Sequence, residues 1–371
     1  MKGIALLGST GSIGTSTLNV LRRHPDRFRV AALVAGSNAA ALDLQAAEWQ
    51  PAFTAVVNGD GRHAHARGHE VLVEAATRDD VDIVVNAVVG AAGLDATLAA
   101  LRAGKRVALA NKETLVMAGT LVAAAAREGG GELVPVDSEH SAVLQCVAAQ
   151  GAAPCRLILT ASGGPFRTWE RDRVEQATVA EALNHPTWQM GAKVSIDSAT
   201  LANKALELIE AHFLFGLGYD SLEVVVHPQS IVHAFVDFPD GSVLAQVGFP
   251  SMEVPILYAL THPHRLADDG VRRFDPVAAG PLTFEPVRED CFPAFRLGLD
   301  AGRAGGAAPA VFNAANEIAV AAFLAERITF GGIAHVIERS LERHGGDPAD
   351  SLEALREVDR NVRRTAEEAI K

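Results

Sequence analysis

The sequence is poor in cysteine, in positive charge and in long apolar runs, and each shortage excludes a class of protein. Cys146, Cys155 and Cys291 are odd in number and lack a CxxC spacing, so we expect neither a disulfide framework nor a zinc site, and a reducing compartment fits best. The formal net charge of -12 disfavours nucleic-acid binding, because phosphate backbones would be repelled. The apolar runs are interrupted by charges, so no membrane span is predicted.

Aromatic residues are also scarce, at 5% of a chain that is 49% hydrophobic. Ala, Val, Leu and Gly must therefore form most of the core, which suits helices packed closely on a parallel sheet. The length of 371 residues predicts two or three domains. The strand-like segment Ile4–Leu7 follows Met1 so closely that we expect no targeting segment and a cytoplasmic protein.

Residues 1–137 alternate short β-branched runs with longer helical stretches. This alternation predicts right-handed βαβ units and a Rossmann-like parallel sheet, an α/β fold in which ligands gather at the carboxyl ends of the strands. The candidate strands are Ile4–Leu7, Arg29–Ala35, Phe53–Val57, Ile83–Val89, Val107–Ala110 and Leu133–Val136.

The pattern changes in residues 138–261, which predict an α+β domain with an antiparallel edge. A long helix is expected around Ala199–Phe215, and Asp240-Gly241 indicates a hairpin turn. The candidate strands are Leu157–Thr160, Val224–His227, Ile231–Phe238 and Val243–Phe249.

The last third of the chain divides into an arm and a helical end. Residues 262–287 are typical of a connecting arm, because they contain four X-Pro dipeptides that favour turns and loops. These are His262-Pro263, Asp275-Pro276, Gly280-Pro281 and Glu285-Pro286. Residues 288–371 predict a C-terminal helix bundle. Asp350 and Glu353 have the spacing of a capping box at the start of its last helix.

A glycine-rich turn, Gly8 to Gly14, joins the first strand to the first helix. Glycines here allow a tight turn and a close approach to a pyrophosphate, which the N-terminus of the next helix also attracts. The spacing is GxxGxxG rather than GxGxxG, so an unrelated glycine turn stays an alternative. After the second strand comes the neutral Gly36-Ser37-Asn38, where an NAD enzyme presents a carboxylate, and this favours NADPH.

Two polar segments follow later strands, namely Asn111-Lys112-Glu113 and Asp137-Ser138-Glu139-His140. On an extended segment, Asp137 and Glu139 would point to the same side, and two neighbouring carboxylates repel unless a proton or cation joins them. Oxygen ligands select Mg²⁺ or Mn²⁺. The alternative is an exposed acidic loop.

A third constellation lies between Lys193 and Glu207. If a helix begins near Ser198, then Asn203, Lys204 and Glu207 share one face, and Ser198 with Asn203 and Lys204 could bind a phosphate. Glu207 could complete a metal site of three carboxylates. The alternative is an ordinary helix cap with a surface Lys–Glu pair.

Seven blocks of this sequence are similar to those of 1-deoxy-D-xylulose 5-phosphate reductoisomerases, in the same order from residue 1 to the C-terminal helices. They are GSTGSIGTSTL, ALANKETLVMAG, PVDSEHSA, TASGGPFR, NHPTWQMGAKVSIDSATLANKALELIEA, HPQSIVHAFV and FNAANEIAVAAF. The resemblance implies an NADPH-binding domain at residues 1–137, a catalytic and dimerisation domain at 138–261, the arm at 262–287 and the bundle at 288–371. It also implies a homodimer.

The resemblance assigns roles to individual residues. The implied NADPH contacts are Thr10, Gly11, Ser12, Ile13, Gly36, Ser37, Asn38, Asn111, Glu113 and Gly191. The implied metal ligands are Asp137, Glu139 and Glu207, for Mg²⁺ or Mn²⁺ with Co²⁺ as a further candidate. The implied substrate contacts are Lys112, Ser138, Glu139, Ser162, His185, Ser198, Asn203, Lys204 and Glu207, and the implied catalytic residues are Lys112, Glu139, His185, Trp188 and His233. Ala192 departs from the family, where a basic residue is expected.

The implied reaction rearranges a sugar phosphate and then reduces it with NADPH, giving 2-C-methyl-D-erythritol 4-phosphate for isoprenoid precursor synthesis. Two other functions remain open. A semialdehyde dehydrogenase would need an activated cysteine, and Cys146 and Cys155 have no evident base beside them. A dinucleotide-sensing regulatory protein with an inactive second domain would have no reason to keep the set of Asp137, Glu139, Glu207 and Lys204.

Overall fold

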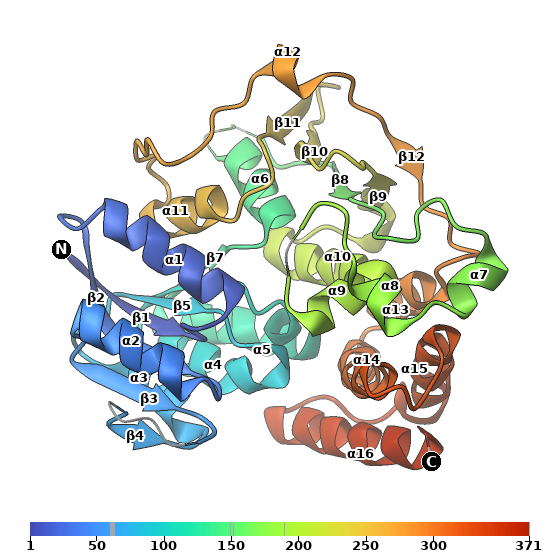
Figure 1. Ribbon diagram of the computed structural model, residues 1–371, viewed down its shortest axis with the longest axis horizontal. Helices are drawn as coiled ribbons and strands as arrows, with labels where there is room; N and C mark the ends of the chain where they lie inside the picture. The colour runs from blue at the N-terminus through green and yellow to red at the C-terminus, as the bar shows by residue number, and fades with distance from the viewer. Residues whose placement is uncertain (60–63, 149, 151, 189, 371) are drawn as a thin grey trace. The chain divides into compact units, whose positions relative to one another are not determined.

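The computed structural model describes residues 1–59, 64–148, 150, 152–188 and 190–370 (Figure 1). The chain forms two compact units. Unit 1 comprises Met1–Thr114, Gly119–Ala148 and Ser251–Arg273, and unit 2 comprises Leu115–Ala118, Ala149–Pro250 and Phe274–Lys371. The functional domains expected to divide at residues 137, 261 and 287 stay a prediction. Within the described ranges, no helix has the length and apolar character that a membrane crossing requires.

Unit 1 is built on a parallel sheet with the strand order β4-β3-β2-β1-β5-β6-β7. Its strands are β1 (Lys2–Leu7), β2 (Phe28–Ala35), β3 (Phe53–Val56), β4 (Ala66–Arg67), β5 (Ile83–Asn86), β6 (Arg106–Leu109) and β7 (Glu132–Pro135). Each of the six strands predicted for this region overlaps one of these. The Rossmann-like sheet is therefore confirmed.

The helices of unit 1 cover both faces of this sheet. They are α1 (Ser12–Arg23), α2 (Ala39–Trp49), α3 (Glu70–Thr77), the 3₁₀ turn η1 (Gly90–Gly93), α4 (Leu94–Arg102), α5 (Glu113–Gly129), α6 (Ser138–Val147) and α11 (Glu253–Thr261). Right-handed crossovers to β2 and β3 run outward from β1 in one direction, and those to β6 and β7 run in the other. The two sets of connecting helices therefore lie on opposite faces.

One face of unit 1 is completed by a segment from much later in the chain. The apolar stripe of α1, with Leu18 and Leu21, is buried in the same core as Ile256 and Leu260 of α11. Arg23 strengthens this junction, because its guanidinium binds the carboxylate of Asp268 at 2.8 Å. Unit 1 is thus a discontinuous unit whose core needs residues 251–273.

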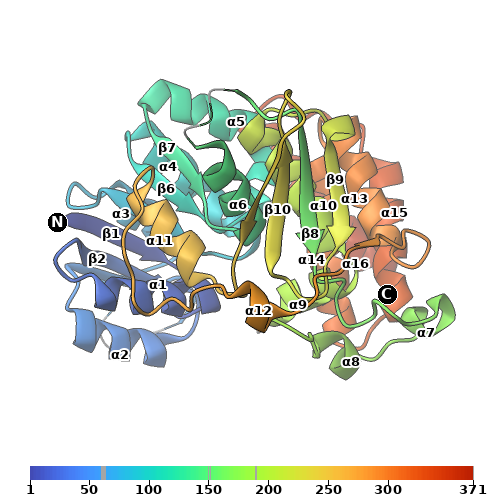
Figure 2. The same cartoon turned by 90° about the horizontal axis from the view of Figure 1, so that it is seen from above.

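Unit 2 contains a mixed sheet with the order β11-β10-β8-β9-β12, and Figure 2 shows β10, β8 and β9 side by side. The strands are β8 (Arg156–Ala161), β9 (Leu222–Val226), β10 (Val232–Asp237), β11 (Val243–Val247) and β12 (Glu285–Pro286). The pair β8 and β9 is parallel, whereas β10 and β11 form an antiparallel hairpin. Gly241 has a φ of 85° in the turn of this hairpin, as the predicted Asp240-Gly241 turn requires.

The remaining elements of unit 2 are mostly helical. They are α7 (Arg171–Glu175), α8 (Val179–Leu183), α9 (Ala192–Ala199), α10 (Ala202–Phe215), the 3₁₀ turn η2 (Tyr219–Ser221), α12 (Pro276–Ala279), α13 (Pro293–Ala304), α14 (Ala308–Leu324), α15 (Phe330–His344) and α16 (Leu352–Ile370). α14 packs against α13, α15 and α16, so the predicted C-terminal helix bundle is confirmed. The last helix is capped differently from expectation: Ser351, not Asp350, accepts a backbone hydrogen bond from Ala354 at 3.2 Å.

Two local predictions near the candidate site are wrong. The helix expected from about Ser198 is two helices, because Leu201 adopts a left-handed conformation with a φ of 58° and separates α9 from α10. Ser198 therefore ends a helix instead of beginning one. Asp137 and Glu139 do not share an extended segment either, because α6 begins at Ser138 and places Glu139 in its first turn.

Candidate active site

The glycine-rich turn after β1 contains two positions at which only glycine fits. Gly8 has a φ of 85°, and a Cβ there would lie 2.5 Å from the carbonyl oxygen of Ala87, which follows β5. A Cβ on Gly14 would lie 2.4 Å from the carbonyl oxygens of Gly8 and Ser9. The turn therefore closes against the end of the neighbouring strand, where the strand order reverses and parallel sheets bind their ligands.

The helix that follows this turn presents an open N-terminus. α1 begins at Ser12, and its N-cap Gly11 contributes no side-chain cap. The first-turn N–H groups and the positive end of the helix dipole favour an anion at this point. The four predicted cofactor contacts on the turn are Thr10, Gly11, Ser12 and Ile13. These residues lie just before the N-terminus of α1 and in its first turn, where an anion is favoured.

The segment after β2 is neutral and exposed. The carboxamide oxygen of Asn38 accepts a hydrogen bond from the backbone N–H of Ala41 at 3.1 Å and caps α2. Gly36 and Ser37 are exposed, and a Cβ on Gly36 would meet no atom within 4 Å. This open turn presents no carboxylate that would repel a phosphate.

Asn111 and Glu113, after β6, are buried. The side-chain amide of Asn111 donates hydrogen bonds to the carbonyl oxygens of Val88 at 2.7 Å and Gly90 at 2.8 Å. Its side chain thus fastens the loop that follows β5. Glu113 accepts a further bond from this amide at 3.1 Å, so both predicted cofactor residues help to shape the sheet edge.

The acidic segment after β7 forms its own contacts within unit 1. Asp137 precedes α6 and makes an ion pair with the ammonium group of Lys112, and the hydroxyl of Ser138 donates to the carboxylate of Glu139. His140 is completely buried in the first turn of α6, and one of its ring nitrogens lies within 4.8 Å of a carboxylate oxygen of Asp137. Asp137 is therefore paired with the ammonium group of Lys112, and Glu139 with the hydroxyl of Ser138.

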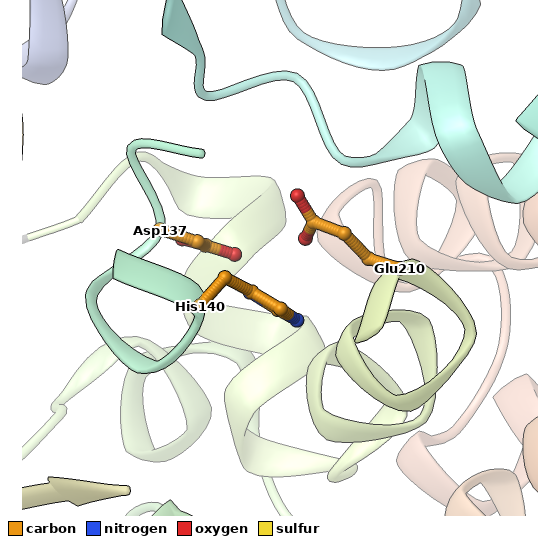
Figure 3. Close-up of side chains that lie close together, drawn as sticks. All are labelled: Asp137, His140 and Glu210. Atoms are coloured by element: carbon orange, nitrogen blue, oxygen red, sulfur yellow. The ribbon is translucent and has the colours of Figure 1, made fainter. Parts of the chain in front are cut away.

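His140 and Glu210 are buried ionisable residues that were not among the predicted site residues. Figure 3 labels them with Asp137, which lies at the turn before α6, whereas Glu210 lies on α10. Glu210 is 1% exposed. The only sequence signal is their spacing, because His140 follows Asp137, and Glu210 follows Glu207, by three residues, which is one helical turn.

In unit 2, the structure brings Ser162 and His185 together. Ser162 directly follows β8, and its hydroxyl lies 2.9 Å from Nε2 of His185. Nδ1 of the same ring accepts backbone N–H groups of Thr187 at 3.1 Å and Trp188 at 2.9 Å. These contacts require an unprotonated Nδ1, which leaves Nε2–H as the donor to Ser162. Burial lowers the pKa of His185, so the ring is held neutral.

Lys204 and Glu207 form a buried pair on α10, at 4% and 2% exposure. The ammonium group of Lys204 donates to Glu207 at 2.5 Å and to the carbonyl oxygen of Thr160, at the end of β8, at 2.7 Å. The amide of Asn203 donates to the other carboxylate oxygen of Glu207 at 2.5 Å. The predicted shared face is confirmed, and burial contradicts the alternative of a surface ion pair.

The other predicted residues of unit 2 are less closely connected. Ser198 lies at the end of α9, and Gly191 is the exposed N-cap of the same helix. Trp188 is partly exposed, which is unlike a core tryptophan, and His233 is 7% exposed on β10. The role of His233 stays a prediction.

The thiols argue against an enzyme that uses a cysteine nucleophile. Cys146, Cys155 and Cys291 are free thiols. Burial raises the pKa of the Cys146 and Cys291 thiols, which disfavours the reactive thiolate. A parallel sheet with a dinucleotide-type turn at its switch point, and with no activated thiol among the three cysteines, is typical of a class: the α/β oxidoreductases that bind a dinucleotide.

Comparison with known proteins places the chain within this class. The family model for 1-deoxy-D-xylulose 5-phosphate reductoisomerase matches residues 4–119, the model for its C-terminal domain matches residues 133–215, and the model for the DXP reductoisomerase C-terminal domain matches residues 247–365. A 1-deoxy-D-xylulose 5-phosphate reductoisomerase of Geobacillus kaustophilus is 51% identical over 98% of each chain. Another from Chloroherpeton thalassium is 50% identical over 98% of this chain and 97% of the relative.

Solved structures agree. A crystal structure of DOX-P reductoisomerase in complex with NADPH, fosmidomycin and magnesium has a TM-score of 0.95 and 41% identity, covering 100% of this chain and 98% of that one. The Zymomonas mobilis enzyme in complex with NADPH has a TM-score of 0.91 and 41% identity, with the same coverage. The chain belongs to the 1-deoxy-D-xylulose 5-phosphate reductoisomerase family.

Proposed function

We propose that this chain converts 1-deoxy-D-xylulose 5-phosphate to 2-C-methyl-D-erythritol 4-phosphate, by a rearrangement followed by NADPH-dependent reduction, in the non-mevalonate supply of isoprenoid precursors. The carrying observation is the 51% identity to a family member over 98% of both chains. The local geometry supports it, because a dinucleotide-type turn and a buried Lys–Glu cluster both lie at carboxyl ends of strands.

The cofactor is NADPH, and the first-domain residues fit it. The turn from Gly8 to Gly14 leaves a cradle that side chains would fill, and the open N-terminus of α1 suits a pyrophosphate. The neutral Gly36–Asn38 turn accepts a 2′-phosphate without like-charge repulsion. Gly191 is a further proposed contact from unit 2.

The divalent cation is Mg²⁺ or Mn²⁺, with Co²⁺ as a further candidate, and we propose Asp137, Glu139 and Glu207 as its ligands. These carboxylates fit a hard cation, because each offers oxygen donors. When bound, NADPH supplies the hydride and the cation polarises the substrate carbonyl. Lys112 is held beside Asp137, where its charge can stabilise a developing oxyanion.

The substrate residues of unit 2 carry the second half of the proposal. Lys204 and the Ser162 hydroxyl would bind the phosphate, whose binding energy fixes the reacting end of the sugar. Neutral His185 donates to Ser162 and so orients that hydroxyl. Trp188, bonded through its backbone N–H to the same ring, would close over the substrate and exclude water. Glu139 is a proposed proton shuttle and His233 a proposed neighbour of the substrate.

A cytoplasmic homodimer completes the proposal. β11 lies at the edge of the unit 2 sheet, and its apolar residues Val243, Leu244 and Val247 are exposed. An exposed apolar edge strand is a surface on which a second copy can pack. Sedimentation of Leu244→Lys against wild type tests this. The three free thiols are compatible with a reducing compartment.

One assay separates the proposed function from the two alternatives. NADPH oxidation is followed on addition of 1-deoxy-D-xylulose 5-phosphate, with Mg²⁺ and after EDTA treatment. We expect turnover that depends on both substrate and cation, and that returns when Mg²⁺ is added back. A semialdehyde dehydrogenase would instead oxidise an aldehyde with a reactive thiol, and a regulatory protein would bind NADPH without turnover.

A further inference from the structure

Two fully buried asparagines lie in the middle of α14, a helix whose other residues are mostly apolar. Asn313 and Asn316 are both 0% exposed. Burying an amide without a hydrogen bond costs about 1–3 kcal/mol, so each should have a purpose. Asn313 donates within its own helix, to Glu317 at 3.0 Å. Asn316 instead donates to a residue 119 positions away, the carboxylate of Asp197 on α9, at 2.7 Å.

Asp197 is fastened from two sides. Its carboxylate is 1% exposed, and the oxygen not bound by Asn316 lies 2.8 Å from the ammonium group of Lys193, one turn earlier on α9. A buried carboxylate is costly unless it is paired, so these contacts define where the charge can lie. The contact with Lys193 stabilises α9 internally, and the contact with Asn316 connects α9 to α14.

The end of α9 that carries Asp197 is also the joint to α10. The carbonyl oxygen of Asp197 accepts a bond from the Thr200 hydroxyl at 3.2 Å, and that hydroxyl accepts the backbone N–H of Ala202 at 3.3 Å. Ser198 lies inside this joint, and Lys204 lies in the first turn of α10. The position of Asp197 therefore sets the positions of two proposed phosphate contacts.

The joint between α9 and α10 is also tightly packed against the glycine-rich turn that follows β8. Gly164, in the turn that begins with Ser162, has a φ of 65°, and a Cβ there would lie 2.8 Å from the carbonyl oxygen of Ser198. The joint is thus packed between the glycine turn and α14. A shift away from α14 would change the spacing between Ser162, Ser198 and Lys204.

We propose that Asp197 and Asn316 are positioning residues, which hold the α9–α10 joint so that Ser198 and Lys204 meet the substrate phosphate. This inference rests on the proposed function, and neither residue is placed in contact with substrate. It gives the FNAANEIAVAAF block of the C-terminal bundle a role in substrate affinity.

The test compares Asn316→Ala with Asn313→Ala, a matched change of an equally buried asparagine on the same helix. Turnover gives KM for the sugar phosphate, calorimetry gives Kd for inorganic phosphate, and fluorescence gives Kd for NADPH. We expect Asn316→Ala to raise the first two about tenfold, with kcat changed less and NADPH affinity unchanged, because a displaced phosphate grip mainly weakens binding. Asn313→Ala should lower the melting temperature without moving KM by more than about twofold.

Two further variants keep the test decisive. Asn316→Leu preserves volume and removes the donor, so it replaces Asn316→Ala if that variant does not fold. The exchange Asp197→Asn with Asn316→Asp restores one hydrogen bond between the two side chains and should recover part of the phosphate affinity. Equal KM changes in the Asn313 and Asn316 variants, or none in either, would overturn the inference. Absence of turnover and of phosphate binding in wild type would instead overturn the proposed function.

Discussion

The residues predicted to bind the cofactor in unit 1 and those predicted to bind the phosphate in unit 2 are held in place in different ways. In unit 1 the predicted cofactor residues depend largely on the backbone: on Gly8 and Gly14, on the N-terminus of α1 and on a neutral turn. In unit 2 the residues predicted to bind the phosphate are held by side-chain contacts: Lys204 and Glu207 are buried and paired with each other, and His185 is partly buried and bonded to Ser162.

This difference predicts opposite sensitivities. A site made of backbone tolerates exchange of one side chain for another but does not tolerate an added Cβ. A site made of buried charges tolerates small changes in the backbone nearby but does not tolerate loss of one partner, because the remaining charge is left in a low-dielectric environment.

The largest effect is expected from Lys204→Ala. The substitution removes the buried partner of Glu207 and should cost about 3–5 kcal/mol of folding free energy. It should also weaken sugar-phosphate binding about ten- to a hundredfold while NADPH affinity stays unchanged. Calorimetry below the melting temperature measures both ligands. A substrate without its phosphate should lose little further on this variant, and simple addition of the two losses would show that Lys204 does not contact the phosphate.

The next largest effect is expected from Gly14→Ala, which tests the backbone half. Its Cβ would lie 2.4 Å from two backbone oxygens, an overpacking that costs about 1–3 kcal/mol. We expect NADPH binding to weaken about five- to a hundredfold, measured by fluorescence quenching. Gly218→Ala is the matched control, because a Cβ there would meet no atom within 4 Å and Gly218 is not a predicted cofactor contact. Equal losses in both variants would contradict the steric explanation.

A smaller effect is expected from Ser37→Asp in the exposed turn after β2. The added carboxylate should repel a 2′-phosphate and reduce the preference for NADPH over NADH about tenfold. The ratio of kcat/KM for the two cofactors measures this. Ser37→Asn adds similar volume without charge and should keep the preference. Equal activity of the wild type with NADPH and NADH would contradict the predicted preference for NADPH.

The smallest effect is expected from pH, through His185. Its pKa is lowered by burial, so the folded state favours the neutral ring. The stabilisation is fully present above the usual histidine pKa of about 6.5 and is lost as pH falls, because the unfolded chain then binds more protons. Protonated Nδ1 cannot accept the N–H groups of Thr187 and Trp188. Because the pKa of His185 in the folded protein is lowered, we expect KM for the sugar phosphate to rise a few-fold only at pH values well below the usual histidine pKa, and His185→Gln to remove this dependence.

The sequence predicts unit 1 better than unit 2, for physical reasons. Parallel strands buried on both faces are continuous apolar runs, so β1, β2 and β6 are recognisable within one or two residues. The break between α9 and α10 has no such signal. Leu201 adopts a left-handed conformation that glycine usually marks, and the packing around it compensates for the strain.

The candidate site shows the same contrast. The glycine turn and the strand-end carboxylates are recognisable because their function depends on local spacing. The burial of Lys204 with Glu207, and the bond from Asn316 to Asp197 across 119 residues, depend on tertiary packing. No local sequence pattern indicates either the buried pair or the long-range bond. Helix α6 likewise begins at Ser138, whereas an extended Asp137–Glu139 segment would require it to begin after Glu139.

The discontinuity of unit 1 has a consequence for how the protein is made. Helix α11 emerges from the ribosome after the whole of residues 149–250, yet Ile256 and Leu260 cover the core that α1 faces. At roughly 5–20 residues per second, about 100 intervening residues leave that apolar face uncovered for roughly 5–20 s of synthesis. During this interval an apolar face of unit 1 is exposed, and a ribosome stalled before residue 251 would display an unfinished, aggregation-prone first unit.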